Sequence, residues 1–163
     1  MILTLLLILG LIFICFSAVL AFGAPYLPTL KPQVAVAFQL ANLKPGQTLL
    51  ELGCGDGRVL IAAAKLGVNS IGYELNPLLA LAAWARTRRY RSNVRVIWGN
   101  YWHKKWPPSD CIFTFLLERY MPKLDNMINA YPTKPVVLIS FAFKVPKKDV
   151  AGTKDGVFLY RYK

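Results

Sequence analysis

The chain has 163 residues, of which 55% are hydrophobic and 17% are charged, and its first 30 residues contain no Asp, Glu, Lys, Arg or His. What remains suits one folded domain and excludes two, and the apolar content excludes general disorder. Lys and Arg number 20 against 8 Asp and Glu, a net charge of +12. Such a basic body indicates an anionic partner such as lipid, nucleic acid or an acidic protein.

The three cysteines are too few and too scattered for a disulfide framework. No Cys or His spacing is typical of a metal site, and His103 is the only histidine, which excludes a two-histidine centre. We therefore predict no bound metal and a reducing compartment.

The first predicted element is a membrane helix over residues 2–22. Its 21 residues would span roughly 31 Å at about 1.5 Å per residue, close to the roughly 30 Å core of a bilayer. A cleaved signal peptide and a buried core helix are the alternatives. The length of the run and the absence of basic residues before it favour a retained anchor. Because all the positive charge follows the helix, the body is expected in the cytoplasm and the N-terminus outside.

The rest of the chain alternates predicted helices and strands. Helices are expected where apolar residues recur every three or four positions, and strands where short apolar runs are bounded by turn residues. The predicted helices cover residues 31–43, 58–66, 77–90 and 121–130. The predicted strands cover residues 48–52, 70–74, 94–98, 111–116, 136–141 and 156–162.

Strands separated by helices predict an α/β fold with a Rossmann-like, doubly wound and mainly parallel sheet. The last strand, residues 156–162, follows an Asp-Gly turn and is expected to be an antiparallel edge strand. We thus predict a transmembrane anchor over residues 1–24, a juxtamembrane linker and helix over residues 25–46, and a ligand-binding domain over residues 47–163.

A glycine-rich loop lies where the first of these strands ends, and residues 51–57 read ELGCGDG. Its glycines let the backbone turn sharply and approach a ligand closely. Asp56 in this loop would repel a pyrophosphate, which disfavours NAD and FAD. Glu74 ends the second strand, where a carboxylate can accept both hydroxyls of a ribose. A nucleotide-like ligand is expected here; the alternative is a tight turn in which Asp56 caps the helix.

Several stretches together resemble the class I, seven-strand S-adenosylmethionine-dependent methyltransferases. Residues 26–29 read YLPT, residues 52–58 read LGCGDGR, and residues 72–77 read GYELNP. Within that class the chain is similar to the protein-lysine methyltransferases of adenine nucleotide translocase and the ATP synthase c-subunit, and to their prokaryotic relatives. Those proteins also have an N-terminal hydrophobic segment. The similarity is dense over residues 26–77 and looser over residues 99–124.

The resemblance implies that S-adenosylmethionine is the cofactor. Gly53, Gly55 and Asp56 would line its methionine moiety, and Glu74 would hold its ribose. Asn100 lies where many relatives have an acid near the adenine, and an amide can still form a hydrogen bond there. The predicted cofactor-binding residues are Glu51, Gly53, Gly55, Asp56, Gly57, Glu74 and Asn100.

The resemblance also places residues 117–121 in the segment that usually faces the methyl acceptor. Glu118 is predicted to guide a lysine ammonium into the site, and Tyr120 and Asn100 to narrow its entrance. Glu118 and Tyr120 are therefore the candidate catalytic residues. The alternative is that Glu118 is an ordinary surface partner of Arg119 or Lys123.

These features predict a membrane-anchored methyltransferase that modifies a lysine of a membrane protein. Two alternatives remain open: methylation of a membrane-soluble small molecule such as a quinone or lipid precursor, and a non-catalytic module that binds S-adenosylmethionine at a membrane. The arginines of residues 86–95, with Lys104 and Lys105, are interpreted as a lipid contact or a solvated face. A nucleic-acid partner is disfavoured.

Overall fold

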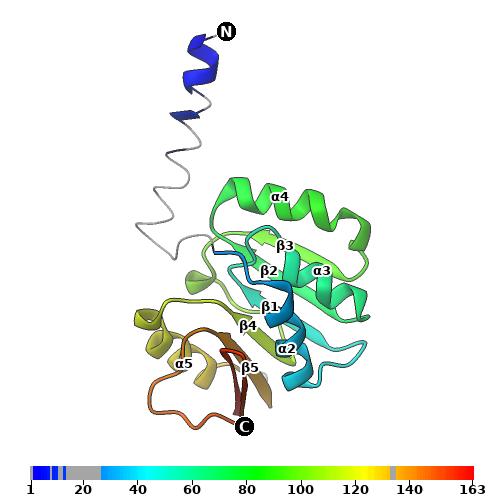
Figure 1. Cartoon of the computed structure of the whole chain (residues 1–163), viewed down its shortest axis with the longest axis vertical. Helices are drawn as coiled ribbons and strands as arrows, with labels where there is room; N and C mark the ends of the chain where they lie inside the picture. The colour runs from blue at the N-terminus through cyan, green and yellow to red at the C-terminus, as the bar shows by residue number, and fades with distance from the viewer. Residues whose placement is uncertain (1, 8, 11–12, 14–26, 133–134) are drawn as a thin grey trace.

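The computed structural model describes residues 2–7, 9–10, 13, 27–132 and 135–163, and Figure 1 shows helices packed against a central sheet. The strands are β1 (Thr48–Leu52), β2 (Asn69–Glu74), β3 (Val94–Trp98), β4 (Cys111–Thr114), β5 (Val136–Phe141), β6 (Gly152–Lys154) and β7 (Val157–Tyr162). The α-helices are α2 (Lys31–Ala41), α3 (Arg58–Lys65), α4 (Pro77–Thr87) and α5 (Met121–Asn129). Three short 3-10 helices cover Arg88–Tyr90, Tyr101–His103 and Glu118–Tyr120.

The sheet has the strand order β3-β2-β1-β4-β5-β7-β6. Strands β1 to β5 are parallel to their neighbours among themselves, as predicted. The chain moves outward from β1 to β3 and then returns to β4 on the other side of β1. At such a reversal the loops after neighbouring strands diverge and leave a crevice at the carboxyl ends of the strands. The topology therefore places a ligand site beside the loops that follow β1, β2 and β4.

Helix boundaries follow the expected local signals. The side chain of Asn76 accepts hydrogen bonds from the backbone N–H groups of Leu78 (2.9 Å) and Leu79 (3.3 Å), so it caps α4 as predicted. Pro77 occupies the first position of that helix, where no backbone donor is needed. The start of α4 is thereby fixed directly after β2.

Hydrophobic clusters lie on both faces of the sheet. Leu50 and Ile112 pack with Leu124 of α5 on one face, whereas Leu49 and Phe113 pack with residues of α2 and α3 on the other. Neighbouring strand residues point to opposite faces, so this alternation shows that the central strands are buried on both sides. The predicted mainly parallel, Rossmann-like sheet is confirmed.

The predicted position of the last strand is wrong in one respect. β7 is antiparallel to β5, as expected, but β6 pairs with its other side and forms the edge of the sheet. Asp155 (φ 49°) and Gly156 (φ 75°) form a two-residue turn that joins β6 to β7 as a hairpin. β6 has three residues, Gly-Thr-Lys, which are too few and too polar to show a strand pattern. The burial of Leu159 and Tyr160 fits the interior position of β7.

The predicted transmembrane helix, residues 2–22, lies mostly outside the described residues. Residues 2–7 and 9–10 are helical. Within the part of the chain that the structure describes, no helix is long and apolar enough to cross a membrane.

Candidate functional site

The loop after β1 is held against β2 by its backbone. The N–H groups of Gly53 (3.0 Å) and Cys54 (2.8 Å) both donate to the carbonyl oxygen of Tyr73. Gly53 has φ 90° and its surface is exposed, and a Cβ atom built on it would meet nothing within 4 Å. The loop is therefore open beside Gly53, where a ligand can lie against the backbone.

Gly57 has the opposite environment. Its φ is 78°, and a Cβ atom there would lie 3.2 Å from side-chain carbons of both Ala83 and Thr87 of α4. A side chain would clash with that helix in a backbone region that L-residues rarely adopt. Gly57 thus lets the start of α3 pack closely against α4. This is a structural role, and its predicted contact with the cofactor stays a prediction.

Glu74, the last residue of β2, connects this loop to the start of α4. Its Oε2 accepts a hydrogen bond from the Gly55 N–H and its Oε1 accepts one from the Asn76 N–H, each at 2.8 Å. Burial raises the pKa of this carboxyl above its usual value, and the hydrogen bonds from Asn76 and Gly55 counteract part of that rise. Each oxygen has a second lone pair that a ribose hydroxyl can use.

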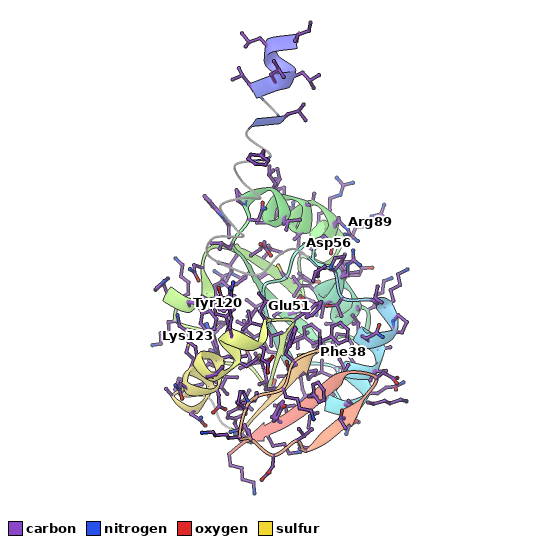
Figure 2. All side chains as sticks on the ribbon, turned by 60° about the vertical axis from the view of Figure 1, so that its left-hand side comes forward. Phe38, Glu51, Asp56, Arg89, Tyr120 and Lys123 are labelled. Atoms are coloured by element: carbon purple, nitrogen blue, oxygen red, sulfur yellow. The ribbon has the colours of Figure 1, made fainter. Side chains whose placement is uncertain are left out.

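Glu51 is a carboxyl group buried within the sheet, at the fourth position of β1. Its Oε2 atom has no hydrogen-bond partner among the described residues. Burial raises its pKa well above the usual value, the charges of Glu74 and Asp56 raise it further, and Arg58 opposes them. An unpaired buried oxygen is costly unless a ligand satisfies it. Figure 2 shows Glu51 near the middle of the molecule.

Asp56 is paired with two arginines. Its carboxylate accepts hydrogen bonds from Arg58 (Nη2 at 2.9 Å) and forms an ion pair with Arg86 of α4. Burial acts to raise its pKa, but the hydrogen bonds and charges of Arg58 and Arg86 lower it to about 2. Asp56 therefore stays ionised and is held by two arginines, a pairing that the sequence did not indicate.

The structure changes the alternative in which Asp56 caps the helix and the interpretation of Arg86 as part of a basic surface. Gly57, and not Asp56, occupies the N-cap position of α3, although Asp56 Oδ1 accepts a hydrogen bond from the Arg58 N–H at the start of that helix (3.3 Å). Arg86 was expected in a basic surface, but from the last turn of α4 it reaches across to the loop instead. The spacing of 30 residues between Asp56 and Arg86 provides no sequence signal for this contact.

The residues after β3 and β4 form an aromatic cluster, which we define as Tyr101, Trp102 and Tyr120. The ring centroids of Tyr101 and Trp102 are 4.7 Å apart, and those of Trp102 and Tyr120 are 6.1 Å apart. The pKa of Tyr101 is raised by burial and also by the nearby Tyr120 and Glu74. This cluster therefore extends from the Glu74 end of the site to the segment after β4.

Asn100 lies directly before this cluster in the chain. Its side-chain oxygen accepts a hydrogen bond from the Trp102 N–H (3.0 Å), which starts the short helix of residues 101–103. The side-chain NH₂ group of Asn100 could still donate a hydrogen bond to an adenine. The contact between Asn100 and adenine stays a prediction.

Glu118 is exposed and begins the short helix that ends at Tyr120. Glu118 forms no ion pair with Arg119 or Lys123. Instead, Arg119 lies over the Tyr120 ring at 4.8 Å, and Lys123 lies over the Trp102 ring at 4.4 Å. Figure 2 shows Tyr120 and Lys123 on the same side of the molecule. No sequence pattern indicated the cation–π contact between Lys123 and Trp102.

S-adenosylmethionine fits the cofactor end of this site. The unpaired Glu51 oxygen suits its ammonium group, the open backbone at Gly53 leaves room for its methionine chain, and Glu74 retains acceptor capacity for its ribose. Asn76 Nδ2 and Thr114 Oγ1 are also buried without a partner in the described part of the chain. No group of three or more His, Cys, Asp or Glu side chains among those residues could hold a metal ion.

The strand order, the glycine-rich loop after β1 and the buried acid after β2 define the class I fold of S-adenosylmethionine-dependent methyltransferases. Residues 51–151 match the family described as the ANTKMT methyltransferase domain. The chain belongs to this family, which confirms the resemblance seen in the sequence. S-adenosylmethionine is its cofactor.

Curated relatives agree with this family. The chain is 29% identical over 126 residues to the ATP synthase c-subunit lysine N-methyltransferase of Xenopus laevis, a match that covers 75% of this chain and 54% of that protein. It is 29% identical over 150 residues to a protein-lysine N-methyltransferase of Saccharolobus islandicus (strain REY15A), which covers 83% of this chain and 92% of that protein. The chain thus spans about half the length of the Xenopus relative but nearly all of the archaeal one.

A solved structure has the same fold. The RNA methyltransferase of Salinibacter ruber, crystallised with S-adenosyl-L-homocysteine, superposes with a TM-score of 0.77 at 26% identity. The superposition covers 83% of this chain and 92% of that one. Since these similar proteins are named for different acceptors, the fold fixes the cofactor chemistry and not the acceptor.

Proposed function

We propose that the protein transfers the methyl group of S-adenosylmethionine to the side-chain amine of a lysine in another protein. The observation that carries this proposal is the exposed Glu118, which lies in the same short helix after β4 as the half-buried Tyr120 of the aromatic cluster. A carboxylate and aromatic rings suit a cationic side chain brought by a second molecule. The lysine methyltransferases of Xenopus laevis and Saccharolobus islandicus support the same acceptor.

The side chains of the protein need to contribute little to the methyl-transfer step itself. When bound, the cofactor supplies an electrophilic methyl group on a sulfonium, so positioning of the amine provides much of the rate acceleration. The lysine ammonium must first release a proton to water. Its nitrogen lone pair then forms the new N–C bond while the C–S bond breaks, and sulfur keeps that electron pair in the departing S-adenosyl-L-homocysteine. Glu118 attracts the ammonium to the entrance, and loss of hydration beside Tyr120 favours the neutral amine.

The proposal includes a membrane location, with residues 1–24 as an anchor, the N-terminus outside and the catalytic domain on the cytoplasmic side. The uncharged run of residues 2–22 supports it. The large apolar side chains described in that run are between 52% and 75% exposed, so they need an apolar environment that the domain does not provide. The acceptor would then be a lysine of a membrane protein, close to the bilayer.

Two measurements test the location. Carbonate extraction should leave the full chain in the membrane fraction, and protease added to the cytoplasmic side should digest the domain. A mature N-terminus near Pro25, found by mass spectrometry, would contradict the anchor. Protection of the domain from that protease would contradict the orientation.

The acceptor is tested with the full chain in detergent, S-adenosylmethionine labelled in its methyl group, and membranes from cells that lack the gene. We expect label in a protein band whose acid hydrolysate contains methylated lysine. Label in the lipid extract would favour a quinone or lipid precursor, and label in RNA would favour a nucleic-acid acceptor. If the protein binds the cofactor but transfers no label, the non-catalytic alternative replaces the proposal. Glu74→Ala is the inactive control.

A further inference from the structure

One edge of the domain carries positive charge without any acid. Residues 75–109 include seven Lys and Arg and no Asp or Glu, so all eight acids of the chain lie elsewhere. These residues form α4, β3 and the short helices after each of them. Arg86 forms an ion pair with Asp56, which Arg58 shares. The other six bases form no ion pair with any acid that the structure describes.

Large apolar side chains are exposed at the same edge. Leu81 is 62% exposed and Trp84 55%, and they lie three residues apart on the outer side of α4. Trp98, at the end of β3, is 67% exposed. Its indole N–H donates to the carbonyl oxygen of Leu75, just before α4 (3.1 Å), so the ring lies beside the start of that helix. Single exposed apolar residues are ordinary, but three at the same edge of the sheet favour a contact site.

Basic side chains lie beside Trp84 and directly after α4. The guanidinium of Arg91 lies over the Trp84 ring, 5.0 Å from its centroid. Arg88 follows Trp84 by one helical turn and is exposed. Figure 2 shows Arg89 projecting from the end of α4, away from the body. We define the α4 face as Leu81, Trp84, Arg88, Arg89, Arg91 and Trp98.

We propose that the α4 face binds the anionic surface of a lipid bilayer and orients the domain on it. Tryptophan is favoured at the headgroup level and leucine just below it, and each arginine near an anionic membrane strengthens binding about fivefold. RNA is the competing anionic partner. Leu81 offers nothing to a nucleotide, and Arg91 covers a face of Trp84 on which a base would stack. The mixture of exposed aliphatic, aromatic and basic groups therefore favours lipid.

This face adjoins the cofactor site. α4 begins three residues after Glu74, and the Asn76 N–H donates to the Glu74 carboxylate. Docking of the α4 face would therefore hold the open edge of the site close to the bilayer. The inference rests on the proposed function only in that a protein lysine is the acceptor the site meets at the bilayer. Lipid contact by itself requires no methyl transfer.

The test uses the full chain reconstituted into phosphatidylcholine vesicles with or without phosphatidylserine. Lipids that carry a nitroxide near the headgroup quench only tryptophans that reach the membrane surface. We expect stronger quenching with phosphatidylserine, loss of that increment at high salt, and a smaller increment in Trp84→Phe and Trp98→Phe. Quenching that does not depend on phosphatidylserine would overturn the proposal.

A charge-reversal variant and a matched control sharpen the test. Reversing Arg88, Arg89 and Arg91 to Glu should weaken docking on the order of a hundredfold, since each arginine contributes about fivefold. Lys147, Lys154 and Lys163, also exposed, are reversed in the control, which keeps the same net charge and should dock like the wild type. Circular dichroism verifies that both variants fold. Equal loss in the two variants would mean that only net charge matters and would overturn the assignment to the α4 face.

RNA is tested in parallel with a fluorescent single-stranded oligonucleotide. Tight binding that is lost in the arginine variant, without phosphatidylserine-dependent quenching, would assign the α4 face to RNA and overturn the lipid proposal. Because quenching is measured without methyl transfer, a failed docking test leaves the lysine acceptor untouched. Failure of the lysine assay likewise leaves the docking result intact.

Discussion

The cofactor end and the acceptor end of the site differ in how completely the protein's own residues form them. At the cofactor end, Glu51 and Glu74 are buried, and Glu74 accepts two backbone hydrogen bonds within its own chain. At the acceptor end, Glu118 is exposed and Tyr120 is half-buried at the surface. The first end is preorganised by buried groups, whereas the residues proposed for the second end lie at the surface.

This difference suits a transferase with a macromolecular acceptor. A cofactor shared by many enzymes can be bound by fixed, buried groups whose desolvation has been compensated during folding. A lysine on a protein arrives with its own surface and excludes water only when it docks. We therefore expect substitutions at the cofactor end to change cofactor affinity and stability, and those at the acceptor end to change transfer alone.

The largest effect is expected for Glu74→Ala. This change removes the predicted ribose acceptor and also the partner of the Gly55 and Asn76 N–H groups. Losing an acceptor from several buried donors costs about 1–3 kcal/mol or more, so affinity for S-adenosyl-L-homocysteine should fall on the order of a hundredfold by calorimetry. Glu74→Gln, which keeps an oxygen, should lose less. Wild-type affinity in the alanine variant would contradict the site.

Asp56→Ala should weaken cofactor binding by about tenfold, because Arg58 and Arg86 lose the carboxylate that holds them beside the loop. Arg86→Ala should have a smaller effect, a few-fold in affinity and roughly 0.5 kcal/mol in stability, since its side chain is half exposed and screened by water. Arg88→Ala is the matched control, because Arg88 pairs with no described acid. Equal effects of Arg86→Ala and Arg88→Ala would show that the ion pair does not support the loop.

Asp56 also causes a pH dependence. Its pKa is lowered from 3.8 to about 2 in the folded protein, so its contribution to stability is present above pH 3.8 and is lost as the pH falls toward 2. Wild type and Asp56→Asn should therefore differ in thermal stability at neutral pH, with the difference shrinking in acid. A difference that stays constant down to about pH 2 would contradict the ion pairs.

Glu51→Gln should have the opposite pH signature. Burial, Glu74 and Asp56 raise the pKa of Glu51, so folding favours its protonated form. Its stabilising contribution is present below the usual carboxyl pKa and is lost as the pH rises through the raised value. Glu51→Gln should thus be more heat-stable than wild type near neutral pH, yet bind the cofactor several-fold more weakly because an amide cannot pair with the cofactor ammonium as a carboxylate does. Unfolding scans across pH and calorimetry measure the two effects.

The fold could largely be predicted from the sequence, and so could the positions of the glycine-rich loop and of Glu74 at the ends of β1 and β2. Glycines, a capping Asn76 and apolar runs are local signals, and they predict the strands and helices of the parallel sheet. The hairpin of β6 could not be predicted, because three residues of Gly, Thr and Lys acquire strand geometry only through pairing with β7. Its turn residues, Asp155 and Gly156, were the visible sign that the chain doubles back there.

Contacts between distant elements were the part that the sequence did not reveal. Arg86 reaches Asp56, and Lys123 lies over Trp102, only because folding brings α4 to the loop and α5 to the segment after β3. Periodicity marks which residues of a helix are exposed, but not which distant group an exposed arginine meets. The unpaired oxygen of Glu51 is likewise visible only when the surrounding packing is known.

The smallest expected effect is that of Glu118→Gln, which tests the acceptor end directly. The Glu118 side chain is exposed and forms no hydrogen bond or ion pair with any described residue, so this substitution should leave stability and cofactor affinity unchanged. If it attracts the lysine ammonium, transfer to the proposed protein acceptor should fall a few-fold, as expected for one exposed carboxylate, and the loss should be greatest at low salt. Asp149→Asn, another exposed acid, is the control for net charge. Reduced cofactor affinity in Glu118→Gln would move this residue to the cofactor end, and an equal loss of transfer in Asp149→Asn would remove its specific role.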